Sequence, residues 1–188
     1  GTLLIGTNGS NVPYTLAGFT VDCRYSELSP TSANHGISIA DTDGVVCDDI
    51  EVVDYLNSAI LINSTGENNK GAVISNSVCD GNIIAGNGFL IVSYSDAAII
   101  NCLGENIRAT VGTGPGHALQ LKNKCLGGKI VGSTAINSTV GVGFGFDGST
   151  FGASSVNVHG CYSELCEAGL QMDTVKNSNI SMTIDQQS

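Results

Sequence analysis

The chain has 188 residues, of which 41% are hydrophobic and 13% are charged. This composition excludes a disordered chain, because disordered segments combine low hydrophobicity with high charge. The 17 Asp and Glu residues outnumber the 7 Lys and Arg residues, and the net charge of −10 disfavours nucleic acid and anionic membranes as partners.

A four-residue pattern of a small, an apolar, a variable and an apolar residue recurs along the chain. Its copies begin at Gly36, Ala59, Gly88, Ala118, Gly143 and Gly169. A second element with alternating apolar residues follows each copy, at residues 45–47, 73–76, 99–102, 129–132, 156–159 and 180–182. A third, weaker strand often comes next, as at residues 50–52, and turns rich in Asn, Asp and Gly separate the elements.

Two or three short strands per repeat describe one coil of a solenoid. Apolar side chains at equivalent positions of successive coils then stack about 4.8 Å apart, and one coil alone cannot bury them. The repeats therefore predict an all-β fold, a right-handed single-stranded parallel β-helix of about six to seven coils. A β-sandwich is the alternative, but its strands would not keep a recurring pattern of this kind.

We expect residues 1–188 to form a single β-helix domain. The chain opens within a strand, without an initiating Met or a recognisable signal peptide, so we expect it to be a fragment of a longer protein. It holds no run of 18 apolar residues, and this predicts no membrane-spanning helix.

The seven cysteines follow no zinc-binding spacing, and several, such as Cys47 and Cys102, lie inside apolar strands. We expect them to be reduced and to act as small core residues, with disulfides as the alternative. Reduced cysteines indicate folding in a reducing cytoplasm. The histidines His35, His117 and His159 are scattered, so we expect neither a metal site nor a cofactor.

The residue that follows each copy of the pattern defines an outward-facing column. Its members are Ala40, Asn63, Val92, Lys122, Asp147 and Asp173. On this alignment Asp147 and Asp173 lie on adjacent coils, about 5 Å apart, which is the spacing of the carboxylate pair in a retaining glycosidase. We therefore take Asp147 and Asp173 as the candidate catalytic residues. A role in turns is the alternative, since Asp147 precedes Gly148.

Polar side chains beside this column are the candidate substrate-binding residues. Lys122 belongs to the column, and Gln120 and Gln171 face outward next to it. Tyr94, in a turn with Asp96, is the first aromatic candidate for stacking on a sugar ring, because the chain has no Trp. Tyr25, Tyr55 and Tyr162 are further candidates, and a solvated surface without a ligand is the alternative.

Residues 16–23, 35–39, 45–52 and 59–62 together resemble the opening coils of pectate-lyase-like parallel β-helix proteins, a superfamily that includes bacteriophage tailspikes. Similarity to tailspikes implies a homotrimeric protein of the virion tail, made in the host cytoplasm, that binds host surface polysaccharide. It also implies endo-acting glycoside hydrolase activity. Residues 35–39 resemble the His-Gly segment of polygalacturonases as well, but the other motifs of that family are missing. A secreted monomeric pectinase-like enzyme and a non-catalytic shaft of a virion fibre remain the alternatives.

Overall fold

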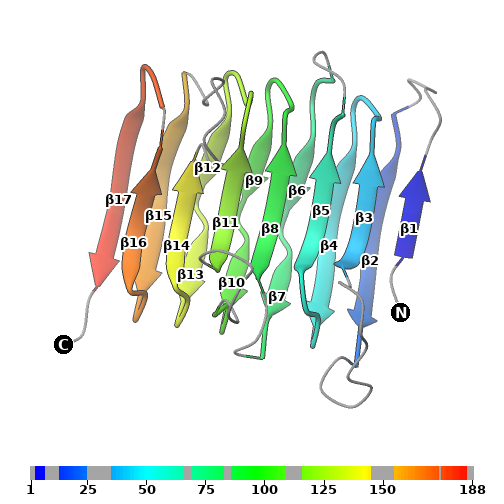
Figure 1. Ribbon diagram of the computed structural model, residues 1–188, viewed down its shortest axis with the longest axis horizontal. Coiled ribbons are helices and arrows are strands. Elements are labelled where there is room, and N and C mark those ends of the chain that lie inside the picture. The colour runs from blue at the N-terminus through cyan, green and yellow to red at the C-terminus, as the bar shows by residue number, and fades with distance from the viewer. Residues whose placement is uncertain are drawn as a thin grey trace.

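The computed structural model describes residues 3–6, 13–24, 35–65, 69–82, 86–108, 116–144, 155–173 and 175–185. Within these ranges the chain forms two parallel sheets that face each other (Figure 1). The first sheet contains β1 (Leu3–Gly6), β3 (His35–Ala40), β5 (Ser58–Asn63), β8 (Asn87–Val92), β11 (His117–Lys122), β14 (Val140–Phe144) and β16 (Ala168–Met172). The second contains β2 (Thr15–Asp22), β4 (Val46–Val53), β6 (Val73–Ser75), β7 (Val78–Asp80), β9 (Ala98–Ile100), β10 (Leu103–Glu105), β12 (Lys129–Val131), β13 (Thr134–Ile136), β15 (Asn157–Glu164) and β17 (Asn179–Asp185).

The strand pairings confirm the predicted parallel β-helix. Each strand of the first sheet pairs in parallel with the equivalent strand of the next winding, as β3 does with β5 and β5 with β8. The described chain closes about four turns, fewer than the six to seven coils expected. The first sheet also contains strands of windings whose connecting segments lie outside the described ranges. The described residues contain no helix of the length and hydropathy needed to cross a membrane.

A bend divides each winding of the second sheet into two halves. The long strand β4 pairs with β6 before the bend and with β7 after it. The residue at the bend has a positive φ in each winding from β2 to β15, at Gly18, Asp49, Asn76, Asn101, Gly132 and Gly160. Glycine, and to a lesser degree Asn and Asp, tolerates this conformation, which explains the turn residues inside an otherwise apolar segment.

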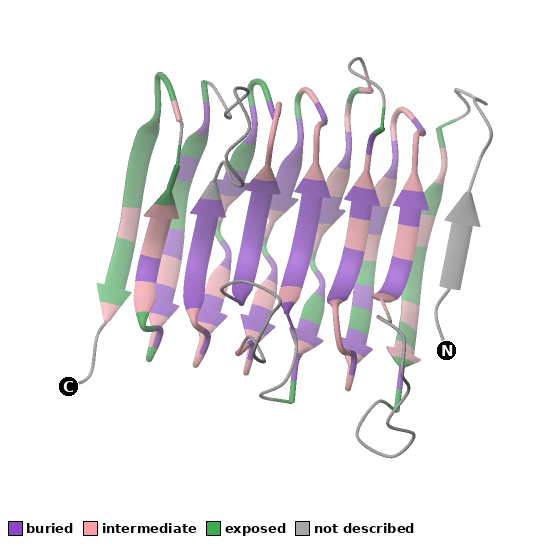
Figure 2. Ribbon diagram, viewed as in Figure 1, coloured by how far each residue is buried: buried purple, intermediate pink, exposed green. Residues whose placement is uncertain are grey.

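Stacked apolar side chains form the core between the two sheets. Ile37, Ile60, Phe89 and Leu119 are register partners in successive windings, and none of them is exposed. Figure 2 shows the strands β8 and β11 buried along most of their length. This ladder is what the alternating apolar pattern predicts for a solenoid.

The small residue of the repeated pattern lies where two strands approach closely. A Cβ atom at Gly36 would overlap Cγ1 of Val52 and the carbonyl oxygen of Ala59. A Cβ atom at Gly88 would overlap the carbonyl oxygen of Ala118. Gly36 and Gly88 thus leave no room for a side chain, and Ala59 and Ala118 take the equivalent place in other windings, which explains why the pattern begins with a small residue.

The structure moves one copy of the pattern two residues toward the N-terminus, from Gly143 to Gly141. His117 pairs with Val140 and Leu119 with Val142, so Gly141 and not Gly143 is the counterpart of Ala118. The segment 141–146 alternates glycine with apolar residues and satisfies the pattern in both registers. The pairing of β14 with β11 and β16 therefore determines which of the two registers the chain adopts.

The cysteines match the expectation of reduced core residues. All seven are free and buried. Burial raises the pKa of the Cys47 thiol to about 12 and the pKa values of the Cys102 and Cys125 thiols to about 11. Several thiols donate weak hydrogen bonds to carbonyl groups, as Cys161 does to Ile130 over 3.4 Å.

Candidate functional site

The structure overturns the alignment behind the predicted pair Asp147 and Asp173. Phe144 is the register partner of Met172, so the copy of the pattern in β14 ends at Phe144 and Asp147 does not directly follow it. Asp147 lies outside the described residues, and Asp173 is exposed just after β16. The catalytic roles of both residues stay predictions. The predicted alignment that placed them at equivalent positions of adjacent coils is wrong.

Tyr94 is not the surface platform that the sequence suggested. Its side chain is fully buried, and its hydroxyl donates to the carbonyl oxygen of Thr42 over 3.0 Å. Tyr55 is also fully buried, whereas Tyr25 lies outside the described residues. The error has a physical cause, since a residue just after a strand can still point into the core when the chain turns around it.

The other predicted binding residues do not share one open surface. Gln120 in β11 is only 3% exposed, and its outward neighbours Leu90 and His117 are buried as well. Gln171 and Lys122 are partly exposed, and Asp96 is exposed in its turn at a φ of 55°. Lys122 does lie beside the turn of Tyr94 and Asp96, because its carbonyl accepts a hydrogen bond from the Ser93 N–H.

A different surface concentrates carboxylates. It is the outer face of the second sheet beyond the bend, formed by the ends of β2, β4, β15 and β17 and by β7, β10 and β13. Its outward side chains form two register columns, which we call the acidic face. One column is Thr20, Glu51, Val78, Leu103, Thr134, Tyr162 and Thr183, and the other is Asp22, Val53, Asp80, Glu105, Ile136, Glu164 and Asp185.

Asp80 and Glu105 are adjacent carboxylates at the centre of this face. They are register partners at the ends of β7 and β10, so their Cα atoms lie about 4.8 Å apart across parallel strands. Asp80 Oδ1 accepts hydrogen bonds from the Asn82 N–H over 2.9 Å and from Asn106 Nδ2 over 3.1 Å. Partial burial, together with the charge of Asp80, raises the pKa of the Glu105 carboxyl.

This arrangement provides two carboxyl groups with different environments. The raised pKa of Glu105 favours its protonated form, which can donate a proton. Asp80 is held in place by two hydrogen bonds, as a carboxylate nucleophile should be. In retaining glycosidases two carboxyl groups lie roughly 5 Å apart, and one attacks while the other protonates the leaving oxygen. Outward side chains of adjacent parallel strands, such as Asp80 and Glu105, are neighbours that can adopt such a spacing.

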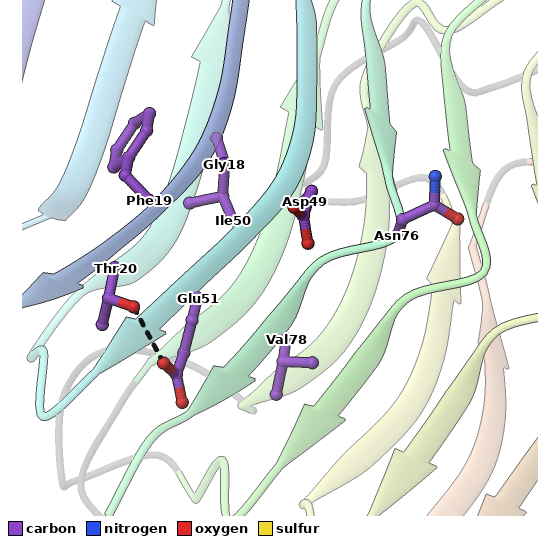
Figure 3. Close-up of a pocket in the computed structure, with 8 residues that line it drawn as sticks. All are labelled: Gly18, Phe19, Thr20, Asp49, Ile50, Glu51, Asn76 and Val78. Carbon is purple, nitrogen blue, oxygen red and sulfur yellow. Dashed lines mark hydrogen bonds between the residues drawn. The ribbon is translucent and has the colours of Figure 1, made fainter.

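A hollow of about 280 Å³ lies on the second sheet, over the bend and the first residues beyond it (Figure 3). Its lining residues are Gly18, Phe19, Thr20, Asp49, Ile50, Glu51, Asn76 and Val78. The Thr20 hydroxyl donates to Glu51 Oε2 over 3.0 Å at its edge, and Val78, two residues before Asp80, is 36% exposed. The volume lies just below the range of about 300–1,000 Å³ for whole small-molecule sites, so the hollow suits one part of an extended ligand.

A second carboxylate pair lies further along the same face. Glu164 and Asp185 are register partners in β15 and β17, and the Tyr162 hydroxyl donates to Asp185 Oδ2 over 3.3 Å. Ile136 separates Glu164 from Glu105. The acidic face therefore carries carboxylates on both sides of an apolar stretch.

The described ranges hold no group of three or more His, Cys, Asp or Glu side chains arranged to bind a metal ion. The chain matches no protein-family model, and no curated protein is significantly similar to it in sequence.

Proposed function

We propose that this protein binds a polysaccharide along the acidic face and hydrolyses it with retention of configuration at Asp80 and Glu105. The observation that carries the proposal is the register pairing of these two carboxyl groups. Neighbouring Val78 and Leu103 add apolar surface, which suits the C–H faces of sugar rings. The face is open and repeats along the solenoid, as an endo-acting enzyme needs for a long chain.

The proposed reaction has two displacements. Asp80 attacks the anomeric carbon while Glu105 protonates the leaving glycosidic oxygen, so the C–O bond breaks and a glycosyl ester forms on Asp80. Glu105, now ionised, then removes a proton from a water molecule that attacks the same carbon. The ester bond breaks, and Asp80 and Glu105 return to their starting states.

Biologically, we propose a role like that of a bacteriophage tailspike, a homotrimeric virion protein that engages host surface polysaccharide. The support is the parallel β-helix together with seven buried free thiols, which suit synthesis in a reducing cytoplasm. Analytical ultracentrifugation of the protein should give a trimer. A monomer would favour the secreted pectinase-like enzyme.

The activity is tested by release of reducing ends from a panel of bacterial surface polysaccharides. Asp80→Asn and Glu105→Gln should each lower turnover roughly 10²- to 10⁴-fold, while binding persists. Asp173→Asn tests the pair suggested by the sequence and should retain turnover. If the unmodified protein binds a polysaccharide but does not cleave it, the protein is a non-catalytic adhesin. Undiminished cleavage by Asp80→Asn would exclude the proposed nucleophile.

A further inference from the structure

Every winding of the acidic face carries a carboxyl group except the one that contributes Thr134 and Ile136. The carboxylates of this face belong to Asp22, Glu51, Asp80, Glu105, Glu164 and Asp185, and none of the outward residues in its two columns is Lys or Arg. Adjacent strands lie about 4.8 Å apart, well inside the Debye length of about 8 Å at physiological salt. The fields of neighbouring carboxylates therefore add at the surface where a ligand chain would lie.

The nearest cations at the rim of this face are already engaged. The Arg24 guanidinium lies 3.6 Å from the Asp22 carboxylate. The Arg108 guanidinium lies 3.4 Å from Glu167 and donates to Asn137 Oδ1 over 2.8 Å. Both guanidinium groups already contact a carboxylate of the protein, so an anionic ligand would have to compete with that carboxylate.

Cationic side chains lie instead on other faces of the solenoid. Lys129 is exposed on β12, in the half of the second sheet before the bend, and Lys122 lies at the end of β11 in the first sheet. Within the described residues, the two columns of the acidic face therefore combine several carboxyl groups with no cationic side chain, which makes this face poorly suited to an anion.

Apolar side chains occupy the centre of the same face. Val78 and Leu103 are register partners, and Val53 and Ile136 lie on either side of the carboxylate pair in the other column. Carboxylates accept hydrogen bonds from sugar hydroxyls, and apolar side chains contact sugar C–H groups. An acid group on the ligand would instead stand next to the Asp80 or Glu51 carboxylate, where like charges repel.

From this charge distribution we infer that the polysaccharide taken by the acidic face is an uncharged polymer of neutral sugars, and that polymers of uronic or sialic acids are rejected. This inference rests on the proposed function and specifies its substrate class. It separates the protein from enzymes that act on pectate, whose polymer is a polyanion.

The test is an array of neutral and acidic bacterial polysaccharides, measured at 50 mM and at roughly 300 mM salt to span the range in which charge screening changes. Each acidic polymer is paired with its carboxyl-reduced form, which has the same backbone without the charge. We expect binding to neutral polymers that changes less than about threefold with salt, and at least tenfold tighter binding of reduced than of unreduced acidic polymers. The double variant Glu164→Gln, Asp185→Asn should raise binding of polygalacturonate, whereas Lys129→Gln should not raise it.

The failures of the two proposals differ. An acidic polymer that binds more tightly than its reduced form, and whose cleavage Asp80→Asn abolishes, would overturn the inference and leave the hydrolase in place. A neutral polymer that binds but is never cleaved would support the inference and overturn the hydrolase. Preference for a cationic polymer, with binding that falls steeply with salt, would overturn the inference, and absence of binding to every polymer would overturn both.

Discussion

The hydroxyl of Tyr94 bridges the backbone of Thr42, donating to its carbonyl oxygen over 3.0 Å and accepting from its N–H over 3.2 Å. The two residues are 52 positions apart, and the winding that contains β5 lies between them. Both side chains are fully buried. This contact joins two turns of the solenoid that do not pair directly through their strands.

Removal of that hydroxyl should destabilise the protein. Tyr94→Phe deletes two buried hydrogen bonds, and we expect a loss of about 1–3 kcal/mol in the free energy of unfolding. Urea denaturation followed by circular dichroism measures it. Tyr162→Phe, whose hydroxyl lies on the outer face, is the matched control and should change stability by less than about 0.5 kcal/mol. Equal stability of the two variants would show that the Thr42 contact contributes nothing.

The seven thiols should be unreactive in the folded protein. All are buried, and the raised pKa values of Cys47, Cys102 and Cys125 leave very little thiolate near neutral pH. Titration with a chromogenic disulfide reagent at pH 7.5 should detect almost no thiol before urea is added and all of them afterwards. Rapid reaction of one thiol without denaturant would place that cysteine at the surface.

The corner occupied by Gly36 should not accept a larger residue. Gly36→Val places its side chain against Val52 and the Ala59 carbonyl, and we expect a cost of about 1–3 kcal/mol or failure to fold. Ser38→Val changes an outward, partly exposed position of the same strand and should cost less than about 0.5 kcal/mol. Thermal melting compares the two variants, and similar melting temperatures would contradict the close packing at this corner.

Ionisation of Glu105 should lower both stability and activity. Its pKa is raised in the folded state, so the folded protein holds its proton more tightly than the unfolded chain does. The stability due to this group is present below the unfolded pKa and is lost as the pH rises through the folded value. Glu105→Gln should remove this decline from a plot of unfolding free energy against pH.

Turnover should fall over the same pH interval, because the proposed acid must carry a proton. An activity profile that rises with pH through this interval would contradict the assignment of Glu105 as the acid.

The parallel solenoid was predictable because its pattern repeats, so many weak local signals agree. The register of β14 was not, since residues 141–146 fit the pattern in two ways and only the neighbouring strands choose between them. The location of Tyr94 was missed because the side-chain direction at a corner depends on the backbone of the turn.

The third strands of their windings carry a recognisable sequence signal for Asp80 and Glu105. Each ends the third strand of its winding, in Val78-Cys79-Asp80 and Leu103-Gly104-Glu105, and Gly81 or Asn106 follows. Alignment of these third strands, in addition to the first ones, would have paired the two carboxylates. Their strands are only three residues long, so the alternation of apolar and polar residues is too short to identify them alone.

Pairing between successive windings has a consequence for how such a chain can change. Because β5 pairs with β8 in the same register in which β3 pairs with β5, deletion or duplication of one whole winding keeps the backbone pairing at the new interface. The number of windings in the solenoid can thus change without a change in the structure of each winding. The outer surface of the solenoid can therefore be lengthened or shortened by whole windings while the packing between the two sheets keeps the same pattern.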